Sequence, residues 1–394
     1  MKLSTKKIIN NNFIITFSAR SIQGLSNLVF IIVSTLIIPI QEFSNFVPFS
    51  VCVGLIVPFM NNGSSDYFQK FDVHKNVHYT LFAVIFFMLT ILSVFLIILF
   101  NFLYEINVLL LLIFVILFIF FESLFRLYSD FKLKDNDVKF LEKTILLSAI
   151  ITIVFSFILL FVLKSWIVLA LKPIIFSFLK YLILRSHRNY NLKIETSQWK
   201  IITIDYLGKI KQLFYFNILS TIVENIDKIL FQFYNSGIVI GNVERLSTFS
   251  RLSDSTFRIP FYRLMISMNI TKEKWSKYTN LVFIPVLTLF CIFMIGIIYF
   301  KYPDVNIVLL YGYLFFGVGW FLRGIFFMQE LYFSESVKLP LKVMKIYMLI
   351  ILVIYVICFF LKVNFESIQL IIGIVTILFW SYFLFLSKKI NFFL

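Results

Sequence analysis

Long apolar segments alternate with short hydrophilic breaks along most of the chain. A helix needs about 20 mostly apolar residues to cross the hydrocarbon core of a bilayer. By this criterion the sequence predicts about twelve membrane-spanning helices, six on each side of a longer hydrophilic connection. They lie near residues 13–40, 43–60, 79–103, 106–127, 144–163, 166–184, 213–234, 237–268, 279–300, 305–328, 341–361 and 367–387. The pattern therefore indicates an all-α polytopic membrane protein.

The positions of lysine and arginine indicate an orientation, because cytoplasmic loops of membrane proteins are rich in these residues. With the N-terminus in the cytoplasm, the basic connections all fall on the cytoplasmic side. The opposite side receives only Lys164, Lys172, Lys301 and Lys362. We therefore expect both termini to be cytoplasmic. Residues 1–184 would form an N-terminal lobe of six helices, 185–212 a basic cytoplasmic linker and 213–394 a C-terminal lobe.

Composition agrees with the membrane class. The chain is 60% hydrophobic and 14% charged, with a mean hydropathy of +0.95, whereas soluble domains are about 45–50% apolar and about 25% charged. The net charge of +16 lies mostly in the cytoplasmic loops, so no nucleic-acid partner is expected. We expect no metal site and interpret the histidines as loop residues and the cysteines as small apolar residues. These residues are His74, His78, His187, Cys52, Cys291 and Cys358.

A small set of basic residues falls inside the predicted spans. It consists of Arg20, Lys228, Arg245, Arg251, Arg258, Arg263 and Arg323. An ionised side chain at the bilayer centre costs at least about 2.5–3.5 kcal/mol, so these residues are expected to face a wet cavity or a partner. The spans contain fewer acidic than basic residues. An anionic ligand such as a phosphate or pyrophosphate group would balance the excess positive charge.

Polar residues recur at helical spacing in three of these spans. In the first span Arg20, Gln23, Asn27 and Ser34 share one face. In the seventh span the polar face consists of Asn217, Ser220, Thr221, Glu224, Asp227 and Lys228. In the eighth it consists of Glu244, Ser247, Thr248, Arg251, Asp254, Ser255, Arg258 and Tyr262. Each face is predicted to line a cavity, although the charges of the eighth span can instead neutralise one another as pairs along the helix.

Arg323 lies in a glycine-interrupted segment of the tenth span, Gly317–Gly324. Glycines in a membrane helix favour a kink or an opening, and an arginine at such a point is a candidate ligand for an anion. The alternative is an arginine near the cytoplasmic end of the span that extends its charged group toward water.

The run Glu224–Leu230, followed by Ile240 and Gly241, resembles the multidrug/oligosaccharidyl-lipid/polysaccharide exporter superfamily. Within it, the chain is most similar to O-antigen and capsular polysaccharide flippases of the Wzx type. The resemblance implies a MATE-like fold of two six-helix lobes in the bacterial inner membrane. It implies a non-enzymatic flippase that moves an undecaprenyl-pyrophosphate-linked oligosaccharide from the cytoplasmic to the periplasmic leaflet by alternating access. Implied partners are this lipid, membrane lipids, a polysaccharide polymerase and a chain-length regulator.

The candidate substrate-binding residues combine the cationic and polar faces. They are Arg20, Gln23, Asn27, Lys228, Arg245, Arg251, Arg258 and Arg323. No glycine-rich nucleotide loop is present, so we expect no cofactor and a proton or sodium gradient as the energy source. Glu224, Asp227 and Asp254 are the candidate coupling residues. The alternative for these acids is a salt bridge to neighbouring basic residues.

Two other functions remain open. The first is an exporter of small solutes, from the same superfamily or of the major facilitator type, although residues 61–76 lack the glycine and arginine signature of the facilitators. The second is a membrane polysaccharide polymerase, which we expect to carry a large periplasmic loop. The predicted topology contains no such loop.

Overall fold

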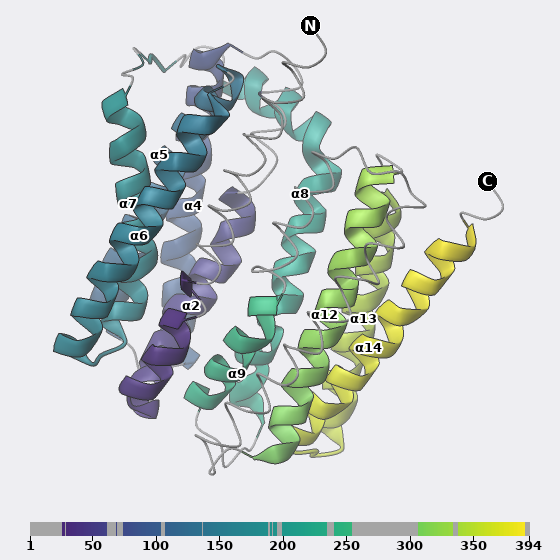
Figure 1. Ribbon diagram of the computed structural model, residues 1–394. Coiled ribbons are helices and arrows are strands. Elements are labelled where there is room, and N and C mark those ends of the chain that lie inside the picture. The colour runs from purple at the N-terminus through teal and green to yellow at the C-terminus, as the bar shows by residue number, and fades with distance from the viewer. Residues whose placement is uncertain are drawn as a thin grey trace, which may run out of the picture. The chain divides into compact units, whose positions relative to one another are not determined.

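The computed structural model describes most of the chain, as helices joined by short connections (Figure 1). The described residues are 26–60 except 28, 68, 74–103, 107–187 except 136, 190–194 except 191, 199–234, 240–253, 306–333 and 338–390. The helices are α2 (Ile40–Met60), α4 (Lys75–Leu103), α5 (Val108–Lys134), α6 (Val138–Leu163), α7 (Ile167–His187), α8 (Trp199–Leu230), the 3-10 turn η1 (Phe231–Phe233), α9 (Ile240–Ser253), α12 (Ile307–Phe333), α13 (Lys338–Phe360) and α14 (Phe365–Ile390).

Eight of the described helices are long and apolar enough to cross a membrane. They are α2, α4, α5, α6, α7, α12, α13 and α14, and each coincides with a predicted span. These eight predictions are confirmed. The predicted span 213–234 is helical in α8 (Trp199–Leu230), but α8 is not among these eight helices. The spans predicted at 13–40 and 237–268 are only partly described, and 279–300 lies outside the described residues. The total of twelve spans therefore stays a prediction.

The chain divides into two compact units. The first, Val29–Ile229, holds α2 to α7 and all of α8 except its last residue. The second holds the described helices from α9 onward. The predicted connection 185–212 is shorter than expected, because α7 continues to His187 and α8 already begins at Trp199. The assignment of residues to two lobes stays a prediction.

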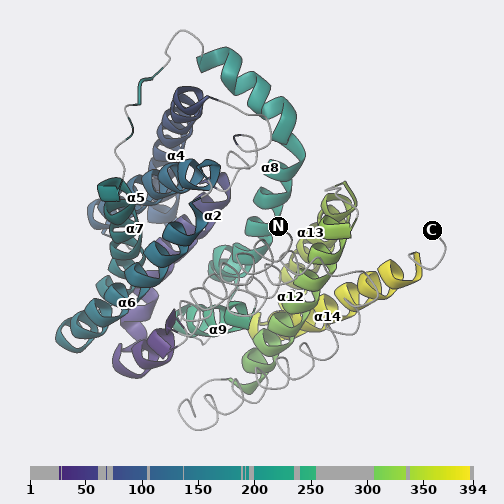
Figure 2. The same cartoon turned by 45° about the horizontal axis from the view of Figure 1, so that its top comes forward.

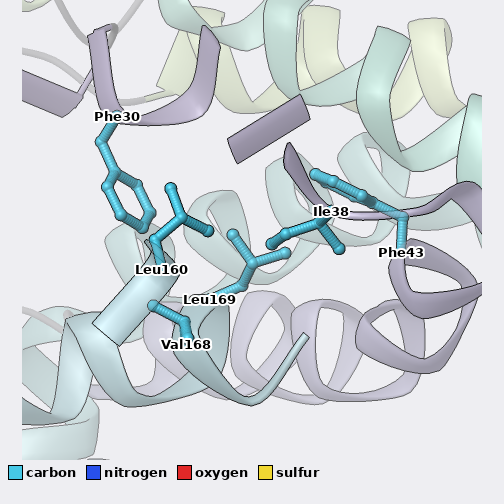
Figure 3. Close-up of a cluster of buried hydrophobic side chains, with 6 residues drawn as sticks. All are labelled: Phe30, Ile38, Phe43, Leu160, Val168 and Leu169. Carbon is cyan, nitrogen blue, oxygen red and sulfur yellow. The ribbon is translucent and has the colours of Figure 1, made fainter. Parts of the chain in front are cut away.

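In the first unit, α5 lies next to α4 and α7, and α7 lies next to α6 (Figure 2). One part of its core joins Phe30 in the first described helical turns, Ile38 and Phe43 near the start of α2, and Leu160, Val168 and Leu169 of α6 and α7 (Figure 3). The opposite faces of α4 and α6 expose large apolar side chains such as Phe87, Phe95 and Phe161. Such faces suit contact with lipid.

Two tight turns close helical hairpins in the two units. Lys164 after α6 and Lys362 after α13 both adopt the left-handed conformation, with φ of 48° and 53°. This conformation satisfies the carbonyl groups at a helix C-terminus, and the Lys164 N–H donates to the Leu160 carbonyl at 3.1 Å. At the same turn the Glu42 carboxylate accepts hydrogen bonds from the Ser165 hydroxyl and the Trp166 N–H, which ties the start of α2 to the start of α7.

Close packing of α12 on α14 explains the glycines of the tenth span. A Cβ atom on Gly319 would lie 2.5 Å from Thr376 Cγ2, and one on Gly312 would lie 2.7 Å from the backbone of Gln369. The predicted opening at this segment does not occur, because α12 is one continuous helix from Ile307 to Phe333. The glycines instead allow two membrane helices to approach closely.

Candidate functional site

In the first unit, polar residues of α8 meet small residues of α2. Lys228 is 1% exposed, and its Nζ donates a hydrogen bond to Ser50 Oγ at 3.3 Å. One turn earlier, the Asn225 amide is buried and lies against Gly54, where a Cβ atom would come within 3.0 Å of both amide heteroatoms. An ammonium, an amide and a hydroxyl are thus placed side by side within one unit.

Two candidate coupling acids lie on the same helix. Glu224 is half-buried and accepts a hydrogen bond from Ser220 Oγ at 3.1 Å. Asp227 is buried and directly precedes Lys228. The final turns of α8 therefore carry two carboxylates and an ammonium at buried or half-buried positions. The third candidate acid, Asp254, lies outside the described residues.

In the second unit, charged residues occur on two helices that pack together, α9 and α12. Glu244 and Arg245 of α9 are buried, and Thr248 Oγ1 donates to Glu244 Oε1 at 3.2 Å. Arg251 belongs to the last turn of α9, but its side chain is outside the described part, as is the whole of Arg258.

Arg323 of α12 is held among aromatic side chains. It is 3% exposed, and its guanidinium carbon lies 3.3 Å from the centre of the Trp320 ring. Phe316 stacks on Trp320, with ring centres 5.1 Å apart and planes inclined by 17°. A stacked guanidinium keeps its charge and its fork of N–H donors in a fixed plane. Arg323 therefore lies inside its unit. The alternative interpretation, in which its charged group extends toward water, does not hold.

The candidate residues of the first span are only partly placed. Arg20 and Gln23 lie outside the described residues, whereas Asn27 is helical and half-buried. Further along this span Ser34 is buried and donates to the Ile31 carbonyl within its own helix.

A buried ionic network joins α5 to α7, and sequence patterns did not reveal it. Glu122 accepts hydrogen bonds from Lys180 Nζ at 3.0 Å, Ser177 Oγ at 2.7 Å and Arg126 Nε at 3.0 Å. The Lys180 ammonium also lies 3.7 Å from the centre of the Phe125 ring. Lys180 falls within the predicted span 166–184 but was counted with the basic residues of the cytoplasmic side, whereas α7 places it inside the bundle. The spacing of Ser177 and Lys180 on one extended helix is the signal that could have found it.

Three other basic or imidazole groups lie in helices, and two of them are histidines that were expected in loops. His78 is fully buried in the first turns of α4, with Nε2 2.9 Å from Asp130 Oδ2 and its ring stacked on Phe68. His187 ends α7 and accepts a hydrogen bond from Lys132. Lys172 lies within α7, 4.0 Å from the centre of the Phe30 ring. The loop interpretation is therefore wrong for the two histidines, because α4 and α7 extend beyond their most apolar stretch.

No protein-family model matches the chain, and no curated protein matches it. Among solved structures, the chain is similar to the crystal structure of the eukaryotic MATE transporter AtDTX14. The two share 12% sequence identity, the match covers 98% of this chain and 96% of the transporter, and the TM-score is 0.52.

The chain has a MATE-like fold. This finding confirms the predicted MATE-like fold. This fold and the eight helices that are long and apolar enough to cross a membrane indicate a multi-pass membrane protein. The described cations lie at buried positions of this MATE-like fold, Lys228 in the first unit and Arg245 and Arg323 in the second.

Proposed function

We propose that the protein is a flippase that moves undecaprenyl-pyrophosphate-linked oligosaccharide repeat units from the cytoplasmic to the periplasmic leaflet of a bacterial inner membrane. The observation that carries this proposal is the burial of Lys228, Arg245 and Arg323 inside helices of a MATE-like fold. Buried charge is costly in a membrane protein and is usually retained where it serves a function.

The chemistry of these groups suits a pyrophosphate. Arginine offers a planar fork of donors that matches phosphate oxygens, and lysine supplies a compact positive charge. Arg323 is already held in a fixed plane by Trp320, so little conformational entropy would be lost when it binds an anion. In the first unit, the amide of Asn225 and the hydroxyl of Ser50 lie close to Lys228 and are suitable partners for sugar hydroxyl groups.

The lipid tail would remain in the bilayer, and the two units would alternate between access from either side. In this scheme both termini are cytoplasmic. Glu224, Asp227 and Asp254 are the carboxylates that we propose to couple transport to a proton or sodium gradient. Arg20, Gln23, Asn27, Arg251 and Arg258 complete the proposed binding surface. A polysaccharide polymerase and a chain-length regulator would act on the exported units.

Export of a small solute is the second candidate function, and the structural likeness to a eukaryotic MATE transporter favours it. The buried cations distinguish the two candidates, because an interior with an arginine and a lysine repels cationic cargo and attracts anionic cargo.

Deletion of the gene followed by lipid extraction tests the proposed function. We expect complete lipid-linked repeat units to accumulate in the cytoplasmic leaflet and surface polysaccharide to disappear, with both effects reversed by the wild-type gene. Single repeat units displayed at the cell surface would point to a polymerase. Normal surface polysaccharide together with sensitivity to small toxic solutes would support the solute exporter.

A further inference from the structure

The chain segment that leaves α7 is attached to the adjoining ends of α4 and α5. Tyr190 in this segment donates its hydroxyl to Asp135 Oδ2 at 2.8 Å. Its ring lies edge-on to Phe131, with the centres 4.9 Å apart. Lys75 forms an ion pair with Asp135 Oδ1 at 2.9 Å and places its ammonium 4.6 Å from the centre of the Tyr190 ring. Tyr190 is therefore held by a hydrogen bond, an aromatic contact and a cation–π contact.

A second attachment follows three residues later. The Lys193 N–H donates to Asn76 Oδ1 at 3.3 Å, and Leu192 packs against a buried cluster that includes Phe68 and Phe131. The helix ends beneath this segment are themselves fixed to each other, because the buried His78 of α4 pairs with Asp130 of α5. The segment is thus attached by several independent contacts to helix ends that are themselves held together.

The attachment shortens the length of chain between its last described fixed point and the start of α8. From His187, the end of α7, to Trp199, the start of α8, the chain has 12 steps and could span about 40 Å when fully extended. From Lys193, the last attached residue, to Trp199 it has 6 steps and could span about 20 Å. Anchoring therefore halves the distance over which the start of α8 can move from the end of the α4–α5 hairpin.

We propose that Tyr190, Asp135 and Lys75 form an anchor that limits the travel of α8 relative to α4 and α5. Because α8 carries Lys228 and Asn225 of the candidate site, the three anchor residues act as positioning residues for that site. Only this link to transport rests on the proposed function. The anchoring itself does not.

Distance measurements between two spin labels test the anchor without any substrate. The labels are placed at Lys139 on α6 and Ile204 on α8, both exposed, after replacement of Cys52, Cys291 and Cys358. We expect a narrow distance distribution in the parent protein. Tyr190→Ala combined with Asn76→Ala removes both side-chain hydrogen bonds that attach the segment, and should add a component at longer distances, up to about 20 Å beyond the parent. Tyr190→Phe keeps the ring contacts and should broaden the distribution less.

Tyr181→Phe is the matched control, because its hydroxyl accepts a hydrogen bond from Arg185 and takes no part in the anchor. It should leave the distribution unchanged. Identical distributions in the parent and in both Tyr190 variants would overturn the anchor. In cells, Tyr190→Ala should reduce surface polysaccharide while lipid binding stays at the parental level. Full export despite a broadened distribution would overturn the link to transport, whereas absence of flipping by the parent itself would count against the proposed function and not against the anchor.

Discussion

Replacing Glu122 by alanine is expected to destabilise the protein by about 3–5 kcal/mol, the usual cost of breaking a buried ion pair. The carboxylate accepts hydrogen bonds from Lys180, Ser177 and Arg126, and the side chains of Glu122 and Lys180 are only 11% and 7% exposed. Without it, two cations would remain close together in the bundle with no carboxylate between them. Thermal unfolding of the purified protein in detergent would show a large fall in the melting temperature.

Lys180→Met should cost less than Glu122→Ala. The lysine variant leaves a carboxylate that still accepts hydrogen bonds from Arg126 and Ser177. The double variant Glu122→Gln/Lys180→Met should recover part of the loss, because no uncompensated buried lysine remains. Lys139→Met is the control, because this lysine is exposed at the start of α6, where a substitution should change stability by less than about 0.5 kcal/mol. Equal melting temperatures for Glu122→Ala and the control would contradict the importance of the network.

Replacing Arg323 by alanine is expected to abolish surface polysaccharide while the protein still inserts in the membrane at normal abundance. The guanidinium is buried against Trp320 and supplies positive charge inside the second unit. Arg323→Lys keeps the charge but loses the planar fork, so partial export is expected. The measurement is surface polysaccharide in a deletion strain that expresses each variant at matched levels.

Lys362→Ala is the control for this prediction. Lys362 lies in the turn after α13, where it is exposed, so removal of its charge should not reduce export. Wild-type export by Arg323→Ala would show that this arginine only fills space between aromatic rings. Loss of export by Lys362→Ala as well would show that the assay responds to the total charge of the protein.

The transmembrane spans were the most predictable part of the fold. A run of about 20 apolar residues has few folded alternatives, so the eight apolar helices of the described part fall where hydropathy places them. Helix ends were less predictable, because a helix can continue beyond its most apolar stretch, by about two turns in α5 and about four turns in α8. For this reason α5 extends to Lys134 and α8 begins at Trp199, well beyond the predicted limits.

The candidate site was predictable only as a set of residues and not as a set of contacts. Helical spacing indicated that Lys228 shares a face of α8 with Glu224 and Asp227. No pattern could show that Ser50 of α2 lies opposite Lys228, or that Asn225 packs against Gly54. Likewise, the glycines of α12 are equally typical of a kink and of close packing. Only the position of Thr376 on α14 decides between these two roles for Gly319.

The central claim is that the buried cations bind the pyrophosphate of a lipid-linked substrate. The most direct test compares the binding of undecaprenyl pyrophosphate and of uncharged undecaprenol to the purified protein. Tryptophan fluorescence measures the binding. The pyrophosphate should bind in a salt-sensitive manner, and Arg323→Ala should weaken its binding at least about tenfold, as expected for the loss of a charged hydrogen bond. Equal binding of the uncharged lipid, or unchanged pyrophosphate binding by Arg323→Ala, would contradict the claim.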